Sequence, residues 1–146
     1  MKVYIEQLKT FNKEDLASVN KLLKQLDSDA FVLTKAEVRE MIDSPANYLF
    51  IARKKDNREM IGMITLIAYR IPVWKKGWIE DLVVDKDYRN KGIATKLINH
   101  AIEKAKNEGV LSLNLTSHRT KKVEANKFYE SLGFKKRDTN IYRIKL

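Results

Sequence analysis

Hydrophobic and polar positions alternate along several short stretches of the chain, and elsewhere the hydrophobic positions recur every three or four residues. Alternation is typical of a strand with one buried face, whereas the wider spacing is typical of an amphipathic helix. Alternating or continuously apolar stretches predict strands at residues 2–8, 47–53, 60–69, 78–84, 110–116 and 139–146.

Local signals mark where the predicted helices begin and end. Asn12 can cap the first helix, and Thr34 opens a capping box of sequence TKAE before the second. Pro45 ends that second helix. Gly109 and Gly133 suit the left-handed position that follows the third and fourth helices. The helices are expected after Asn12 as far as Leu26, between Thr34 and Pro45, from about Asn90 to Asn107, and over residues 121–132.

The order of these elements, β-α-α-β-β-β-α-β-α-β, predicts an α/β (α+β) fold. Three successive strands favour antiparallel pairing, while the strand–helix–strand unit from Trp78 to Thr116 requires a parallel crossover. A mixed, mostly antiparallel central sheet flanked by helices follows. No linker or repeat interrupts the 146 residues, so we expect a single domain over residues 1–146.

Composition limits the kinds of chemistry. The chain has no cysteine, which excludes disulfides, a cysteine nucleophile and thiolate metal sites. Its charged N-terminus does not resemble a signal peptide, and no apolar run reaches the roughly 18 residues needed to span a membrane. We therefore expect a cytoplasmic protein with no membrane contact. The net charge of +10 attracts anions, although it equally describes a solvated lysine-rich surface.

The start of the third predicted helix is a candidate anion site. The amides of a helix's first turn have no partner within the helix, and the helix dipole favours an anion there. In RNKGIAT, Gly92 and Ala94 let an anion approach the backbone, Arg89 and Lys91 add positive charge, and Thr95 offers a hydroxyl. Neither the P-loop nor the Rossmann glycine pattern is present. The alternative is a capped core helix whose first turn is merely basic.

Three stretches resemble one known family. RNKGIA at 89–94 is similar to the R/Q-x-x-G-x-G/A signature of the GCN5-related N-acetyltransferases, with Ala94 in place of the second glycine. WIEDLVVDKDYR at 78–89 resembles the strand that precedes this signature. ANKFYESLGF at 125–134 resembles a late segment of the family. Three motifs in the expected order are much more specific than any one of them.

The resemblance implies the acyl-CoA N-acyltransferase (GNAT-like) fold, with acetyl-CoA as co-substrate and no metal. The pyrophosphate would lie on the backbone amides of the signature. The pantetheine arm would pair with strand backbone left free where the family's sheet splays apart. Asn126, three residues before Tyr129 and on the same face of the last predicted helix, is also expected to hydrogen-bond the cofactor. The implied cofactor-binding residues are Leu82, Val83, Val84, Arg89, Asn90, Lys91, Gly92, Ile93, Ala94, Thr95 and Asn126.

Glu80 is the candidate general base. Strand alternation places Glu80 on one face with Trp78, Leu82 and Val84, and Asp81 on the other. An apolar face raises a carboxyl pKa towards that of a useful base. The resemblance implies the same role, since many members use a glutamate at this place to take the amine proton, often through water. The alternative is a carboxylate at the rim of the sheet, paired with a lysine.

Tyr129 is the candidate general acid. The resemblance implies that its phenol hydrogen-bonds and protonates the departing sulfur, although an amphipathic core tyrosine is the alternative. His100 and His118 stand singly, without the spacing of metal ligands, and Ser117 lacks a His–Asp partner. Direct attack by the acceptor amine is therefore the simplest mechanism.

The expected activity is acetyl-CoA-dependent N-acetylation of a primary amine, on a small molecule or on a protein or peptide. Two other functions compete with it. A basic nucleic-acid-binding module rests on net charge alone, and no helix concentrates arginines on one face. A catalytically inactive acyl-CoA-binding protein is disfavoured because both Glu80 and Tyr129 are present. The resemblance also allows a homodimer, a common state in that family.

Overall fold

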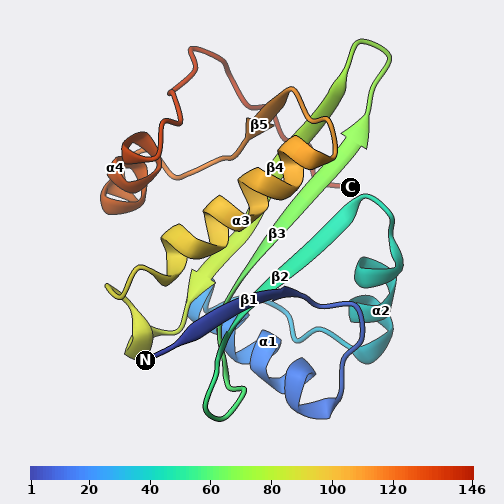
Figure 1. Cartoon of the computed structure of the whole chain (residues 1–146). Coiled ribbons are helices and arrows are strands. Elements are labelled where there is room, and N and C mark those ends of the chain that lie inside the picture. The colour runs from blue at the N-terminus through green and yellow to red at the C-terminus, as the bar shows by residue number, and fades with distance from the viewer. The chain divides into compact units, whose positions relative to one another are not determined.

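The computed structural model describes all residues from 1 to 146 and separates into two compact units, Met1–Leu115 and Thr116–Leu146. The first unit contains five strands and three helices (Figure 1). In chain order these elements are β1 (Val3–Gln7), α1 (Lys13–Leu26), α2 (Lys35–Asp43), β2 (Asn47–Lys54), β3 (Met60–Arg70), β4 (Lys75–Val84), a 3₁₀ turn (Lys86–Tyr88), α3 (Ile93–Asn107) and β5 (Ser112–Asn114).

The five strands form one sheet in the order β1-β2-β3-β4-β5. The first four pair antiparallel, and β4 pairs parallel with β5. The prediction of a mixed, mostly antiparallel sheet is therefore confirmed. The fifth strand is much shorter than the predicted 110–116, because only residues 112–114 pair with a neighbour.

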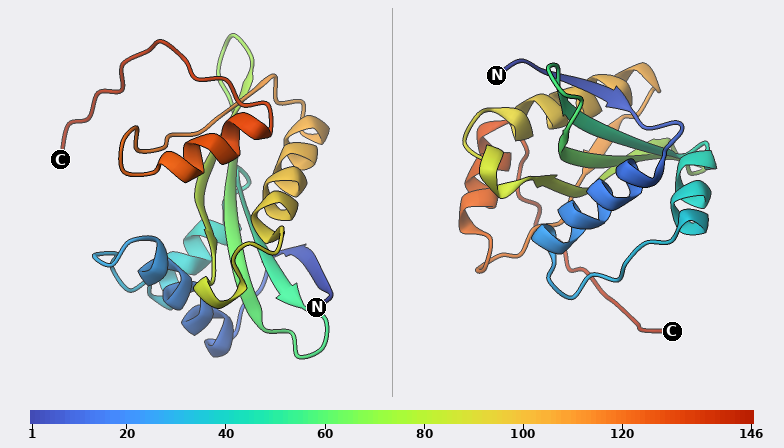
Figure 2. Two further views of the ribbon diagram at one scale, coloured as in Figure 1. Left: turned by 90° about the vertical axis from the view of Figure 1, so that its left-hand side faces the viewer. Right: turned by 90° about the horizontal axis from the view of Figure 1, so that it is seen from below.

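Helices cover both faces of this sheet (Figure 2). On one face, Met63 and Val83 join a buried cluster with Val19 and Leu22 of α1. On the other face lies α3, whose Leu97 is fully buried. A Cβ on Gly62 would lie 3.2 Å from Leu97 Cδ1 and 3.0 Å from the Val83 carbonyl oxygen. The first half of α3 therefore packs directly on the backbone of β3.

The predicted caps form as expected. The Asn12 side chain accepts from the Asp15 N–H at 2.8 Å, and the Asp15 carboxylate accepts from the Asn12 N–H at 3.2 Å. Thr34 and Glu37 make the same reciprocal pair at the start of α2. These side chains satisfy amides that a helix start leaves without partners. The boundaries of α1 and α2 are thus set locally.

The third helix begins three residues later than predicted. Residues 86–88 form a 3₁₀ turn, and Asn90 and Gly92 adopt positive φ angles of 60° and 73°. A left-handed residue cannot belong to a right-handed helix, so α3 starts only at Ile93. Gly109, after its C-terminus, has the predicted left-handed conformation with φ of 74°.

The second unit contains α4 (Val123–Ser131) and Gly133 with φ of 91°, as the sequence indicates. The predicted strand at 139–146 is wrong, because these residues form no regular structure. Tyr142 is 87% exposed there. Alternation supplies an apolar face, but a strand also needs a neighbouring backbone to pair with, and this unit contains no other strand.

None of the helices combines the length and the apolar composition that a membrane crossing requires.

The packing of α3 on the sheet leads to a stability prediction. Leu97→Ala should lower the free energy of unfolding by about 2–5 kcal/mol, because it removes a fully buried side chain and leaves a cavity. Urea unfolding followed by circular dichroism measures this change. Lys96→Ala, next to it on the exposed side of α3, should stay within about 0.5 kcal/mol of the parent. Equal losses in the two variants would contradict the assigned packing.

Candidate functional site

The strands β4 and β5 separate after a short stretch of pairing. Lys76–Trp78 pairs with Ser112–Asn114, and β4 then continues alone on that side to Val84. On its other side β4 pairs with β3 from Lys75 to Val84, with one interruption (Figure 1). The free edge includes Leu82, Val83 and Val84, which are the residues predicted to pair with a pantetheine arm. This sheet therefore splays at the predicted place.

A β-bulge interrupts β4 within this free stretch. Thr65 pairs with Glu80 and Met63 pairs with Val83, so two steps along β3 correspond to three along β4. The bulge coincides with Asp81, whose φ is 51°. An extra residue of this kind shifts the alternation of the side chains that follow it.

The bulge corrects the predicted surroundings of Glu80. Cross-strand pairing places Glu80 on the same face as Trp78 and Val83, and not with Leu82 and Val84 as strict alternation predicts. Strict alternation assumes a regular strand, so it places every side chain after an unrecognised bulge on the wrong face. Val83 belongs to the cluster that packs against α1. Glu80 thus lies on the face of the sheet that α1 covers.

Both carboxyl groups at the bulge have raised pKa values. Desolvation raises the pKa of Glu80, and the nearby charge of Asp81 raises it further. Desolvation also raises the pKa of Asp81. Glu80 has no ion-pair partner, so it does not match the alternative of a rim carboxylate held by a lysine. The sequence analysis placed Asp81 on the opposite face of the strand and gave it no role, and no sequence signal marks the bulge.

The start of α3 presents free backbone amides. The first N–H with an acceptor inside the helix is that of Lys96, which donates to the Gly92 carbonyl at 3.1 Å. The amides of Ile93, Ala94 and Thr95 therefore have no helical acceptor, and Gly92 supplies no side-chain cap. A Cβ on Gly92 would meet no atom within 4 Å. This end of the helix is open to an anion.

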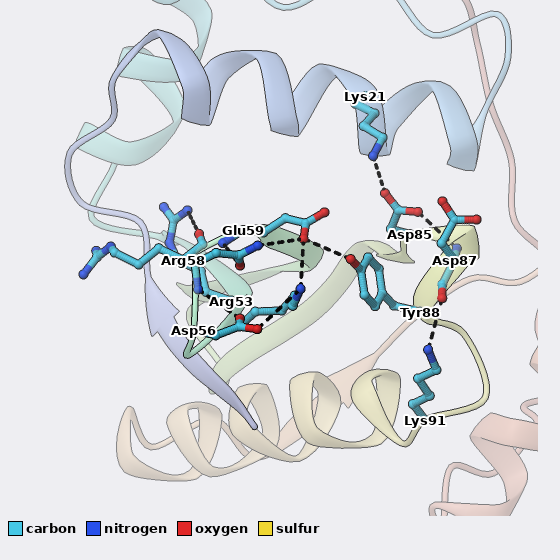
Figure 3. Close-up of polar contacts among 11 residues, drawn as sticks. Lys21, Arg53, Asp56, Arg58, Glu59, Asp85, Asp87, Tyr88 and Lys91 are labelled. Atoms are coloured by element: carbon cyan, nitrogen blue, oxygen red, sulfur yellow. Dashed lines mark hydrogen bonds and ion pairs between the residues drawn. The ribbon is translucent and has the colours of Figure 1, made fainter. Parts of the chain in front are cut away.

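The connection between β4 and α3, residues 85–92, is called the phosphate loop below, and its own contacts hold it in place (Figure 3). The Tyr88 hydroxyl donates to Glu59 Oε2 at 2.9 Å. Arg89 Nε donates to the Val84 carbonyl at 3.1 Å, and Lys91 Nζ donates to the Asp87 carbonyl at 3.2 Å. Sequence reasoning missed Tyr88 and its partner, because 29 residues separate the pair.

In the second unit, Tyr129 lies in α4 against Phe128 and Phe134, with ring centroids 5.4 and 6.0 Å away. Burial raises the pKa of the Tyr129 phenol, so it stays protonated at neutral pH. Asn126 Nδ2 donates to the carbonyls of His118 and Arg119 at 3.2 and 3.3 Å. Asn126 thus secures the loop before α4, and its binding to the cofactor stays a prediction.

Comparison with known proteins identifies the family. Residues 17–134 match the model of the Acetyltransferase (GNAT) family. The chain is 39% identical over 59 residues to N-alpha-acetyltransferase 30 of Schizosaccharomyces pombe. That match covers only 40% of this chain and 39% of the relative.

Solved structures share the fold over the whole chain. An acetyltransferase from Trypanosoma brucei has a TM-score of 0.81 at 23% identity, with 99% of this chain and 100% of that chain covered. The structure of AAC(6')-Iy with the bisubstrate analogue CoA-S-monomethyl-acetylneamine has a TM-score of 0.79 at 20% identity, with 100% and 99% covered. At such identities these likenesses show the fold alone. The family match over residues 17–134 goes further: the chain belongs to the GNAT acetyltransferase family.

Proposed function

We propose that this chain transfers the acetyl group of acetyl-CoA directly to a primary amine. The observation that carries the proposal is the continuity of two open backbone surfaces. The free edge of β4 leads, through a fixed loop, into the free amides at the start of α3. An extended arm that ends in phosphates is complementary to such a surface, and GNAT acetyltransferases use acetyl-CoA.

The two halves of the cofactor would make different contacts. The pantetheine amides would pair, as a strand does, with the backbone of Leu82–Val84. The pyrophosphate would accept from the amides of Gly92–Thr95, where the helix dipole adds to the attraction. Arg89 and Asn90 complete the loop, and Lys91 adds positive charge. Asn126, in α4, would add a hydrogen bond to the same cofactor.

Deprotonating the acceptor is the first chemical requirement. An alkylamine with a pKa of about 10.4 is neutral in roughly one molecule out of 2,500 at pH 7, whereas a peptide α-amine with a pKa near 8 is neutral in roughly one out of ten. The amine nitrogen attacks the thioester carbonyl carbon only in its neutral form. Glu80, directly or through water, would take the proton, and its raised pKa strengthens it as a base.

Breaking the carbon–sulfur bond is the second requirement. When the tetrahedral intermediate collapses, the carbonyl forms again and the sulfur leaves with the bonding electron pair. Tyr129 would donate its phenolic proton to that sulfur. A phenol that stays protonated at neutral pH suits this role.

Acetyl-CoA should raise the melting temperature of the protein, because a ligand that binds only the folded state stabilises it by about 2.7 kcal/mol at a hundred times its Kd. Gly92→Glu should abolish the shift, since a carboxylate would stand where the pyrophosphate binds. Gly109→Glu is the matched control, with a similar positive φ and the same added charge at the other end of α3. Its thermal shift should match that of the parent.

Glu80→Gln should lower kcat by roughly 10²-fold at neutral pH and leave acetyl-CoA affinity unchanged. A base acts only when ionised, so the parent's kcat should fall as the pH drops below the raised pKa of Glu80, and the variant should lack this acidic limb. Assays of CoA release over a range of pH measure both the loss in kcat and the acidic limb of the pH profile. Asp81→Asn makes the equivalent change next to it. If only that variant lost the limb, Asp81 and not Glu80 would be the base.

Tyr129→Phe should lower kcat by roughly 10²-fold without changing the Kd for acetyl-CoA, because it removes one proton donor and keeps the ring. Tyr142→Phe removes a hydroxyl from an exposed ring and serves as the control. With an acetyl thioester of a thiol that has a lower pKa, the sulfur leaves more easily without a proton, so the difference in kcat between Tyr129→Phe and the parent should shrink. A variant with full kcat would exclude the phenol as the acid.

The acceptor can be sought with the same assay of CoA release, comparing free peptide N-termini, lysine side chains and small polyamine or aminosugar acceptors. The short match to an N-alpha-acetyltransferase makes peptide α-amines the first group to test. Turnover with none of these amines, despite tight acetyl-CoA binding, would favour a non-catalytic acyl-CoA-binding protein instead.

A further inference from the structure

A buried carboxylate stands at the beginning of the phosphate loop and takes no part in the chemistry above. Asp85 directly follows β4 and is only 1% exposed. Its backbone N–H donates to the Ile61 carbonyl at 2.9 Å, so it continues the pairing with β3 for one more residue. An ionised carboxylate is buried only where other groups compensate its charge.

The compensating groups come from α1 and from the loop itself (Figure 3). Lys21 Nζ lies 2.7 Å from Asp85 Oδ2, and the Asp87 N–H donates to Asp85 Oδ1 at 3.2 Å. One turn along α1, Gln25 Oε1 accepts from the Lys86 N–H at 2.8 Å. Lys21 and Gln25 are four residues apart, so both reach the loop from one face of the helix.

The charge state of Asp85 supports a persistent contact. Burial opposes its ionisation, but the hydrogen bond and charge of Lys21 and the N–H of Asp87 outweigh burial and hold the pKa of Asp85 below its ordinary value. The same pair raises the pKa of Lys21. Near neutral pH the contact is therefore an ion pair.

These contacts join two parts of the proposed site. The helix α1 packs through Val19 and Leu22 on the face of the sheet that carries Glu80. Through Lys21 and Gln25 the same helix holds the loop whose far end presents the free amides of α3. Within the first unit, no other helix makes a side-chain hydrogen bond or ion pair with this loop.

We propose that Lys21, Asp85 and Gln25 are positioning residues, which fix the phosphate loop to α1 and thereby set the affinity for acetyl-CoA. None of the three touches the cofactor in this proposal. They hold the backbone that does, so their loss should weaken binding by loosening the loop. The inference rests on the proposed function, because it needs acetyl-CoA to bind the phosphate loop.

The test is the Kd for acetyl-CoA, measured by titration calorimetry at a temperature where every variant is folded. Asp85→Asn keeps the shape of the side chain but removes the charge, and should raise the Kd roughly 5-fold or more. In steady-state assays the KM for acetyl-CoA should rise with little change in kcat. Adding Lys21→Met to Asp85→Asn should change the Kd little further, because the pair acts as one unit.

Glu6→Gln is the matched control. It makes the same chemical change in another part-buried ion pair, that of Glu6 with Arg53 at 2.6 Å between β1 and β2. This variant should lose stability but keep the parent's Kd. If Asp85→Asn likewise lowered only the melting temperature and kept the Kd, the contact would be merely structural and the proposal would be overturned.

Gln25→Ala provides a second test if Asp85→Asn does not fold, since it leaves the ion pair intact and removes only the acceptor of the Lys86 N–H. It should also raise the Kd, by a smaller factor than Asp85→Asn. An unchanged Kd in Gln25→Ala would overturn the proposal. A parent protein that does not bind acetyl-CoA at all would be a distinct result, which overturns the proposed function itself.

Discussion

The pairing of β4 with β5 ends at Trp78, and the rest of the site depends on where it ends. Beyond that residue one edge of β4 carries backbone donors and acceptors that β5 does not satisfy. Backbone polar groups require partners, so such an edge favours water or an extended ligand that pairs like a strand. Had β5 continued alongside β4, the sheet would be complete and the same sequence would present no free edge there.

Preorganisation is the second element of the site. The phosphate loop is held by α1 at its beginning, by Glu59 at Tyr88 and by the end of β4 at Arg89. Loops that are already ordered lose less conformational entropy when a ligand binds. The net charge of +10 adds a general attraction for anions, while these contacts fix the loop that leads to the free amides of α3.

Much of the fold could be predicted from local signals, and the limits of that prediction have physical causes. Asn12, Thr34 and Gly109 act through their own turns, so sequence alone located them. The bulge at Asp81 and the late start of α3 depend on backbone conformations that several residue types can adopt. The strand predicted at 139–146 fails because pairing depends on a distant neighbour and not on the pattern itself.

The same difference between local signals and long-range contacts applies to the candidate site. The loop residues 89–95 follow from a motif, but the contacts that hold them join residues far apart in the chain, such as Lys21 with Asp85. A single sequence contains no record of such pairs. The candidate residues could therefore be predicted from the sequence. The face of the sheet on which Glu80 lies could not, because it depends on the register of β3 against β4.

The bare backbone at Gly62 has a geometric consequence for any two-part ligand. Because Gly62 adds no side chain of its own, Leu97 and Ile93 of α3 pack directly on the backbone of β3, and the helix lies close to the strand. The edge of β4 and the first turn of α3 are thus held at a fixed separation, and a ligand that contacts both would have to span it. If acetyl-CoA binds as proposed, the protein would select among thioesters first by the length of the arm that carries the acyl group, and only then by the acyl group itself.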